Sequence, residues 1–296
     1  MPVRSILEEI IDSIERIPPF PKVALRVLEI AEDASADVEE VVKVIQYDQA
    51  ATTNCLKLCN SSYFSLPEKV RSIRHAVVFL GFDTLVRIVI ADCSKSPFSG
   101  RQQRCNAKHL ELWLHSAASA TVSHVLAGRF EDADRYELFT AALLHDIGKL
   151  IIDRFIANNF EAMFHLMQDE GYGMVEAEKA YLGIDHAELG GLIAEAWKFP
   201  PSLINAIRNH HRIDPMDGGI GLNELTVLAN LIAHIKWTTR SLFDHQHIDC
   251  SITEPVLTMF ELTGDDVEQI GEKAYQEMKK TGALLKLPTD LKIKCA

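Results

Sequence analysis

The spacing of apolar residues most restricts how this chain folds, because it follows the helical period almost throughout. Apolar side chains recur at three- and four-residue intervals, as in Val23, Val27 and Ile30, which places them on one face of an α-helix. No two neighbouring segments alternate apolar and polar residues with the period of two that a β-hairpin needs. The sequence therefore predicts an all-α fold.

Capping residues indicate where several of these helices begin and end. Asp37, Ser72 and Asp134 each precede a periodic apolar segment, and each is a good N-cap because its side-chain oxygen accepts hydrogen bonds from the free N–H groups of the first turn. Gly81 is expected to end the helix that follows Ser72. Further helices are predicted over residues 106–128, 160–170, 173–181, 186–197, 201–210, 222–238 and 265–280.

Length and one polar break suggest how the chain divides. Its 296 residues exceed the roughly 150 residues of a typical domain, and segment 94–104 is polar and contains Pro97 and Gly100, which favour a loop. We therefore expect an N-terminal helical lobe and a second helical lobe, followed by a C-terminal helical extension packed on the second lobe. The predicted bounds are 1–100, 101–240 and 241–296.

The acidic charge argues against several classes of partner. The chain has 30 Lys+Arg against 42 Asp+Glu, a formal net charge of −12, whereas a nucleic-acid binder needs a basic face and docking on anionic lipid needs basic segments. No segment reaches the roughly 20 apolar residues of a membrane span, and the N-terminus lacks the apolar core of a signal peptide. We expect a cytoplasmic protein that binds neither nucleic acid nor membranes.

Histidine and carboxylate residues recur at spacings that suit a shared metal ion. Glu111 and His115 are four residues apart, so both face one side of a helix. His145 and Asp146 are adjacent, and adjacent residues within a helix point about 100° apart. Such a pair shares an ion best near a helix end, which Gly148 supplies.

Three more histidines extend the pattern. His186 opens a predicted helix, and the pair His210–His211 closes another. Imidazole and carboxylate ligands together suit first-row transition metals, and two ions about 3.5–4 Å apart could share this many ligands. Lys149 cannot be a ligand while protonated, but it can hold an anionic oxygen near the metals.

The alternative is that these residues are ordinary hydrogen-bonded histidines at helix ends, as any one of them alone would be. Two other histidines, His124 and His234, lie on otherwise apolar stripes. For these two, a hydrogen-bonded place in the core is the better interpretation.

The residues from His145 to Lys149, which read His-Asp-Ile-Gly-Lys, resemble the HD motif of the HD superfamily of metal-dependent phosphohydrolases. Segments of the N-terminal part resemble the HDOD domain, the HD-related output domain of bacterial signalling proteins, and the resemblance extends over about residues 17–240. It implies an N-terminal helical lobe packed on an HD-like metal-binding bundle, and a regulatory role that is often exercised through protein contact. The segments are 17–21, 44–48, 56–64 and 73–81.

The order of ligand types also resembles the HD-GYP phosphodiesterases, which hydrolyse cyclic di-GMP at a bi- or trinuclear centre. The sequence departs from the HD-GYP pattern at two places. Asn230 stands where an Asp ligand is expected, and its amide oxygen is a weaker, neutral ligand. No Gly-Tyr-Pro follows the His-His pair, which weakens the expectation of a cyclic dinucleotide substrate. The metal ligands that the resemblance implies are Glu111, His115, His145, Asp146, His186, His210 and His211.

Two functions remain open from the sequence. The first is a non-catalytic signalling protein that binds a partner protein or a phosphate-containing small ligand, with one or two transition-metal ions in a structural or sensing role. The second is a metal-dependent phosphohydrolase of a nucleotide or cyclic dinucleotide, with Lys149 and Asp146 as catalytic residues. Iron is the first choice of metal, followed by Mn, Zn or Ni. Segment 60–64 and the helices after Ser72 are candidates for partner contact, or alternatively for packing between the lobes.

Overall fold

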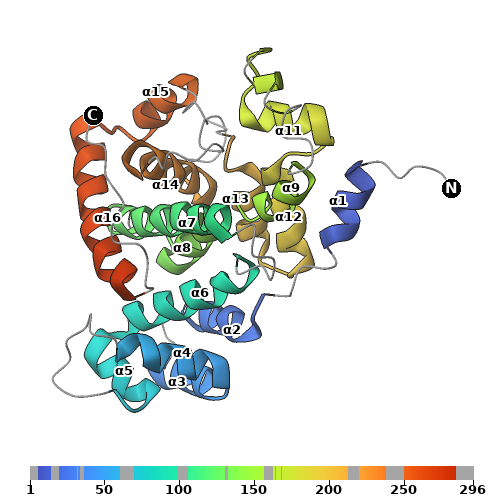
Figure 1. Ribbon diagram of the computed structural model, residues 1–296. Coiled ribbons are helices and arrows are strands. Elements are labelled where there is room, and N and C mark those ends of the chain that lie inside the picture. Colours follow the sequence, from blue (N-terminus) through green and yellow to red (C-terminus); the bar gives the residue numbers. More distant parts are fainter. Residues whose placement is uncertain are drawn as a thin grey trace.

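The computed structural model describes residues 6–14, 20–31, 33, 37–60, 70–98, 106–130, 133–156, 163, 165–167, 169–212, 220–237 and 250–284. These residues form α-helices joined by turns, with no β-strand in the described ranges (Figure 1). The prediction of an all-α fold is therefore confirmed. Every helix within these ranges is too short or too polar to cross a bilayer.

The N-terminal helices pack around one another on one side of α6 (Figure 1). Helix α1 is the exception, because it lies against α9 and α12 of the second lobe. Residues 6–14 thus pack on the predicted second lobe. The helices are α1 (Ile6–Ile14), α2 (Lys22–Ala31), α3 (Val38–Gln46), α4 (Gln49–Cys59), α5 (Ile73–Leu80) and α6 (Phe82–Phe98).

The predicted helix boundaries in this lobe are confirmed by their hydrogen bonds. Asp37 accepts from the backbone N–H of Glu39 before α3, and Ser72 accepts from that of His75 before α5. Gly81 follows α5 with a φ of 80°, a conformation that favours glycine and ends the helix.

The second lobe is built around the long helix α7 (Asn106–Ala127), which packs mainly against α6 and three further helices in the centre of Figure 1. One of them, α8, is buried at Tyr136 and at every position from Leu138 to Leu144, as expected for a helix that is apolar on nearly all sides. Its C-terminal end therefore lies inside the lobe. The remaining helices are α8 (Arg135–Leu144), α9 (Lys149–Ile156), α11 (Met174–Leu182), α12 (His186–Ala196), α13 (Pro201–Asn209), α14 (Leu222–Trp237), α15 (Cys250–Met259) and α16 (Gly264–Leu284).

The C-terminal helices pack against helices of the second lobe. Helix α16 lies along α7 and also contacts α14. Phe260, just after α15, is buried against Phe130 with their ring centroids 5.6 Å apart. Val267 and Ile270 of α16 are also buried, so the apolar side of this helix covers the lobe.

The predicted break between the lobes is partly helical. Helix α6 continues past Pro97 to Phe98, so residues 94–98 do not form the expected loop, while residues 99–105 lie outside the described ranges. The helix contacts α2, α4 and α5 as well as α7 and α8, so it packs against helices of both lobes. Residues 160–162, 164 and 168 of the helix predicted over residues 160–170, and segment 61–69, also lie outside the described ranges.

A close backbone contact fixes the turn that joins α8 to α9. A Cβ atom placed on Gly148 would lie 2.0 Å from the carbonyl oxygen of His186 and 2.9 Å from the backbone N of Gly190. Only glycine lets the turn approach α12 this closely, because neither obstacle is the end of a flexible side chain.

We predict that Gly148→Ala destabilises the protein by about 1–3 kcal/mol or more, because the added methyl group forces α12 away from the turn. Urea denaturation measures the change in the free energy of unfolding. Gly264→Ala is the matched control, since a Cβ there meets no atom within 4 Å and alanine favours a helix. Equal stability of the two variants would contradict the prediction.

Candidate metal centre

Helix ends bring most of the predicted ligands together inside the second lobe. His145 is the C-cap of α8, and His210 is the C-cap of α13. His186 is the first residue of α12, whose N-cap Asp185 accepts from the backbone N–H of Glu188. His115 on α7 and Asn230 on α14 reach the same place, because α14 and α7 pack against each other.

Four of the predicted ligands form a first group. The ligand atoms of Asp146, His186, His210 and His211 all lie within 4.8 Å of one another. The Oδ1 atom of Asp146 is 3.4 Å from His186 Nε2 and 3.5 Å from His210 Nε2. His186 Nε2 is also 2.7 Å from His211 Nε2.

A second group shares the same carboxylate. The ligand atoms of His115, His145 and Asp146 lie within 4.8 Å of one another. The Oδ2 atom of Asp146 is 3.4 Å from His145 Nε2 and 3.9 Å from His115 Nε2. Asp146 therefore joins the two groups, with one oxygen facing each. Glu111 belongs to α7, but its side chain lies outside the described part of the structure, so its role as a ligand stays a prediction.

Three buried polar atoms in these groups lack a hydrogen-bond partner, namely His145 Nε2, Asp146 Oδ1 and His210 Nε2. The three residues are at most 1% exposed. A buried polar atom without a partner costs about 1–3 kcal/mol, so three in one place would be unfavourable unless a cation bound there. Two imidazoles and a carboxylate are suitable ligands for a transition metal, and these residues therefore fit a metal ion.

The other ring nitrogen of each of these histidines is held by a hydrogen bond. His145 Nδ1 lies 2.8 Å from the carbonyl oxygen of Ala142, and His210 Nδ1 lies 2.7 Å from that of Ile207. A histidine that donates from Nδ1 keeps the Nε2 lone pair for a metal, which is the usual arrangement in metal sites. The two rings are thus oriented for binding through Nε2.

Glu178 orients His186 in the same way, and the sequence analysis missed it. Its Oε2 atom lies 2.6 Å from His186 Nδ1 and accepts a hydrogen bond of 2.8 Å from the His186 backbone N–H. The available signal was its place on the buried face of α11, beside Ala177 and one turn after Met174. A carboxylate on such a face needs a partner, and that partner is the imidazole of His186.

Lys149 supplies a fixed positive charge next to the shared carboxylate. Its Nζ atom lies 2.8 Å from Asp146 Oδ2. Burial by itself raises the pKa of the Asp146 carboxyl, but the neighbouring His145 and Lys149 outweigh it and hold that pKa well below its usual range. The carboxylate is therefore ionised and available as a ligand.

Burial lowers the pKa values of several histidines near Asp146 and so favours their neutral form, which is the form that binds metals. It lowers the pKa of His210 to about 4, and it holds the pKa values of His115 and His211 well below 6.5. His234, which the sequence assigned to the core, lies beside this centre with its ring 4.2 Å from that of His115. Burial, followed by the charge of Lys149, lowers the pKa of His234 to about 3.

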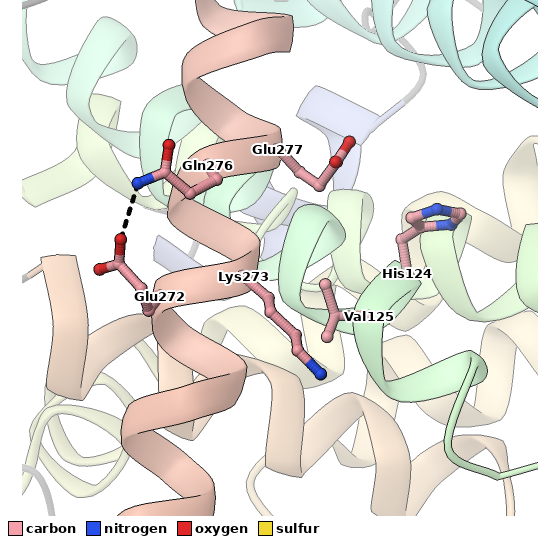
Figure 2. A pocket seen from close by; sticks show the side chains of 6 residues that line it. All are labelled: His124, Val125, Glu272, Lys273, Gln276 and Glu277. Atoms are coloured by element: carbon pink, nitrogen blue, oxygen red, sulfur yellow. Dashed lines mark hydrogen bonds between the residues drawn. The ribbon is translucent and has the colours of Figure 1, made fainter.

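A separate pocket lies between α7 and α16 (Figure 2). It has a volume of about 410 Å³, and none of the predicted ligands lines it. His124 on α7 faces this region, with its Nε2 atom 3.9 Å from Asp83 Oδ2. The two long helices thus line an open groove that is distinct from the candidate metal centre. Its lining residues are His124, Val125, Glu272, Lys273, Gln276 and Glu277.

Comparison with known proteins identifies one family and several relatives. The HDOD domain model matches residues 17–213. An uncharacterized protein of Treponema pallidum (strain Nichols) is 25% identical over 209 residues, which is 69% of this chain and 39% of that protein. The chain thus spans about two fifths of the length of this curated relative.

Solved structures share the fold. A provisionally named phosphohydrolase of Shewanella amazonensis SB2B matches with a TM-score of 0.65 and 24% identity, over 93% of this chain and 96% of that chain. A provisionally named signal transduction protein of Marinobacter aquaeolei VT8 matches with a TM-score of 0.70 and 18% identity, over 95% of this chain and 64% of that chain. At these identities the likeness establishes a common fold.

We predict that Glu178→Gln lowers the affinity for a transition metal about 10–100-fold. The neutral amide oxygen accepts from His186 more weakly than the carboxylate does, so the imidazole is held less firmly and loses part of its basicity. Zn²⁺ titration of chelator-treated protein measures the change. Glu188→Gln is the matched control, because this glutamate is exposed on α12. An unchanged affinity in Glu178→Gln would show that the hydrogen bond has no role in metal binding.

We predict that metal-free protein loses stability as the pH falls from about 6.5 towards 4. An unfolded histidine has a pKa near 6.5, whereas the folded values are about 4 for His210 and about 3 for His234. Between these limits the unfolded chain binds protons that the folded chain excludes, so acid favours unfolding.

Urea denaturation of chelator-treated protein at a series of pH values tests this dependence. His234→Asn removes one of the buried imidazoles, so the free energy of unfolding of this variant should depend less on pH. His165→Gln should keep the wild-type dependence on pH, because His165 is exposed. Stability that is constant or increasing from pH 6.5 to pH 5 would refute the prediction.

Proposed function

The chain belongs to the HDOD domain family, and on that basis we propose that it is a regulatory protein of signal transduction whose second lobe binds a transition-metal ion. One observation carries the metal-binding part of this proposal. His145 Nε2, Asp146 Oδ1 and His210 Nε2 converge in a buried place without hydrogen-bond partners. A bound ion would satisfy all three atoms at once.

The enclosure of the centre favours a structural or sensing role for the ion over catalysis. His145 and His186 are 0% exposed and Asp146 is 1% exposed. Structural metal sites are closed by protein ligands, whereas catalytic sites keep a position open for water or substrate. The relative named as a signal transduction protein is consistent with regulation.

The N-terminal lobe offers a surface for contact with a partner protein. Val78 on α5 is 76% exposed, and Tyr47 at the end of α3 is 91% exposed. Helix α5 follows Ser72, so Val78 lies in the region from which partner contact is expected. Helix α6 links this region to the centre, since it contacts both α5 and α8.

A metal-dependent phosphohydrolase is the second candidate, and the position of Lys149 favours it. Its ammonium group lies 2.8 Å from Asp146, and its side chain is 18% exposed, so it can meet an anionic phosphate at the rim of the centre. A transition metal in the adjacent group would supply Lewis-acid activation of a phosphodiester. The relative named as a phosphohydrolase supports this alternative, while the neutral amide of Asn230 weighs against it.

One experiment with wild type and His145→Ala separates the two candidates. We expect wild-type protein purified without chelator to retain a transition metal by elemental analysis. We also expect wild type and His145→Ala, after incubation with Mn²⁺, to hydrolyse a generic phosphodiester and cyclic di-GMP equally poorly. Exposed His165 provides the control variant His165→Ala, which should behave as wild type.

Two outcomes would overturn these expectations. Less than a tenth of an ion per chain would contradict metal binding. Hydrolysis by wild type and His165→Ala that is lost in His145→Ala would establish the enzyme instead of the regulatory protein.

A further inference from the structure

The two oxygens of Asp146 have different surroundings, although each faces a group of histidines. Oδ1 has no hydrogen-bond partner and faces His186 and His210. Oδ2 accepts a 2.8 Å hydrogen bond from Lys149 Nζ. The ammonium charge therefore already occupies the side of the carboxylate that the second group would use, and it disfavours a further cation there.

The imidazole of His115, also in the second group, already uses its Nε2 atom in a hydrogen bond. His115 Nε2 faces Asp146 Oδ2 at 3.9 Å, but it lies 2.9 Å from Asn230 Oδ1. If the amide is turned round, its nitrogen donates to Nε2 instead, so both orientations use the same ring nitrogen. Asn230 is buried, which makes this hydrogen bond costly to abandon.

The ring of His234 restricts His115 further. The two ring planes are inclined by 32° with their centroids 4.2 Å apart, so the rings lie face to face. His234 belongs to neither group of converging ligand atoms. It therefore packs against His115 and does not add a ligand to the second group.

We propose that Asn230 sets the metal content of this protein at one ion per chain. The ion is bound by the three atoms that have no hydrogen-bond partner, Asp146 Oδ1, His210 Nε2 and His145 Nε2. The bond between Asn230 and His115 withholds the imidazole that a second ion would need. An aspartate at position 230 would add the negative charge that a second divalent cation needs beside Lys149. This inference rests on the metal-binding function proposed above and specifies its stoichiometry.

Zn²⁺ titration of chelator-treated protein by calorimetry, followed by elemental analysis after desalting, tests this proposal. We expect one ion per chain for wild type and two for Asn230→Asp. Asn223→Asp is the matched control, because it makes the same amide-to-carboxylate change about two turns earlier on α14, and it should bind one ion.

A second variant keeps the proposal testable if Asn230→Asp fails to fold. We expect His115→Ala to bind one ion with an affinity within threefold of wild type, because His115 is held by Asn230 and is not a ligand. An affinity more than tenfold weaker would overturn the proposal.

The remaining outcomes are also decisive. Two ions in wild type, or one ion in folded Asn230→Asp, would overturn the role of Asn230 while leaving metal binding intact. No ion in wild type would instead contradict the proposed function itself, together with the stoichiometry that rests on it.

Discussion

The buried carboxylate of Asp146 is the interaction on which the candidate centre depends. An ionised group that is 1% exposed is unfavourable unless opposite charges or hydrogen bonds compensate for the lost water. Here Lys149 compensates at one oxygen, while the other oxygen faces imidazoles without a hydrogen bond. That imbalance explains why the site is suited to a cation on one side only. It also explains why α8, α12 and α13 must converge, since each contributes a residue that faces this carboxylate.

Helix ends orient these residues by a simple local mechanism. The last carbonyl groups of a helix have no partner within it. His145 and His210 follow the ends of α8 and α13, and each Nδ1 reaches the carbonyl oxygen three residues earlier. One hydrogen bond thus satisfies a free carbonyl group and turns Nε2 towards the centre. The backbone contact at Gly148 then sets the distance between this turn and α12, so the positions of the ligands follow from packing of the main chain.

The ligand types and their order along the chain could be predicted, because the signals are local. Apolar periodicity, the N-caps Ser72 and Asp134, and Gly81 define helices within a few residues of themselves. The pairing of histidine with carboxylate at His145–Asp146 likewise needs only the helical repeat. Residues 94–98 were predicted wrongly as a loop, because the local signal of Pro97 does not end α6, which continues to Phe98.

By itself, the sequence determined an all-α chain and most of the side chains that meet at its centre, since helix formation and ligand chemistry depend on residues near one another. Only the tertiary structure decided how these side chains are used. Glu178 orients His186 from another helix, Asn230 engages His115 across 115 residues, and α1 packs beside α9 and α12. The 3.6-residue period determines which face of a helix is buried, but it does not determine which other helix packs against that face. Contacts between distant helices therefore depend on the tertiary structure.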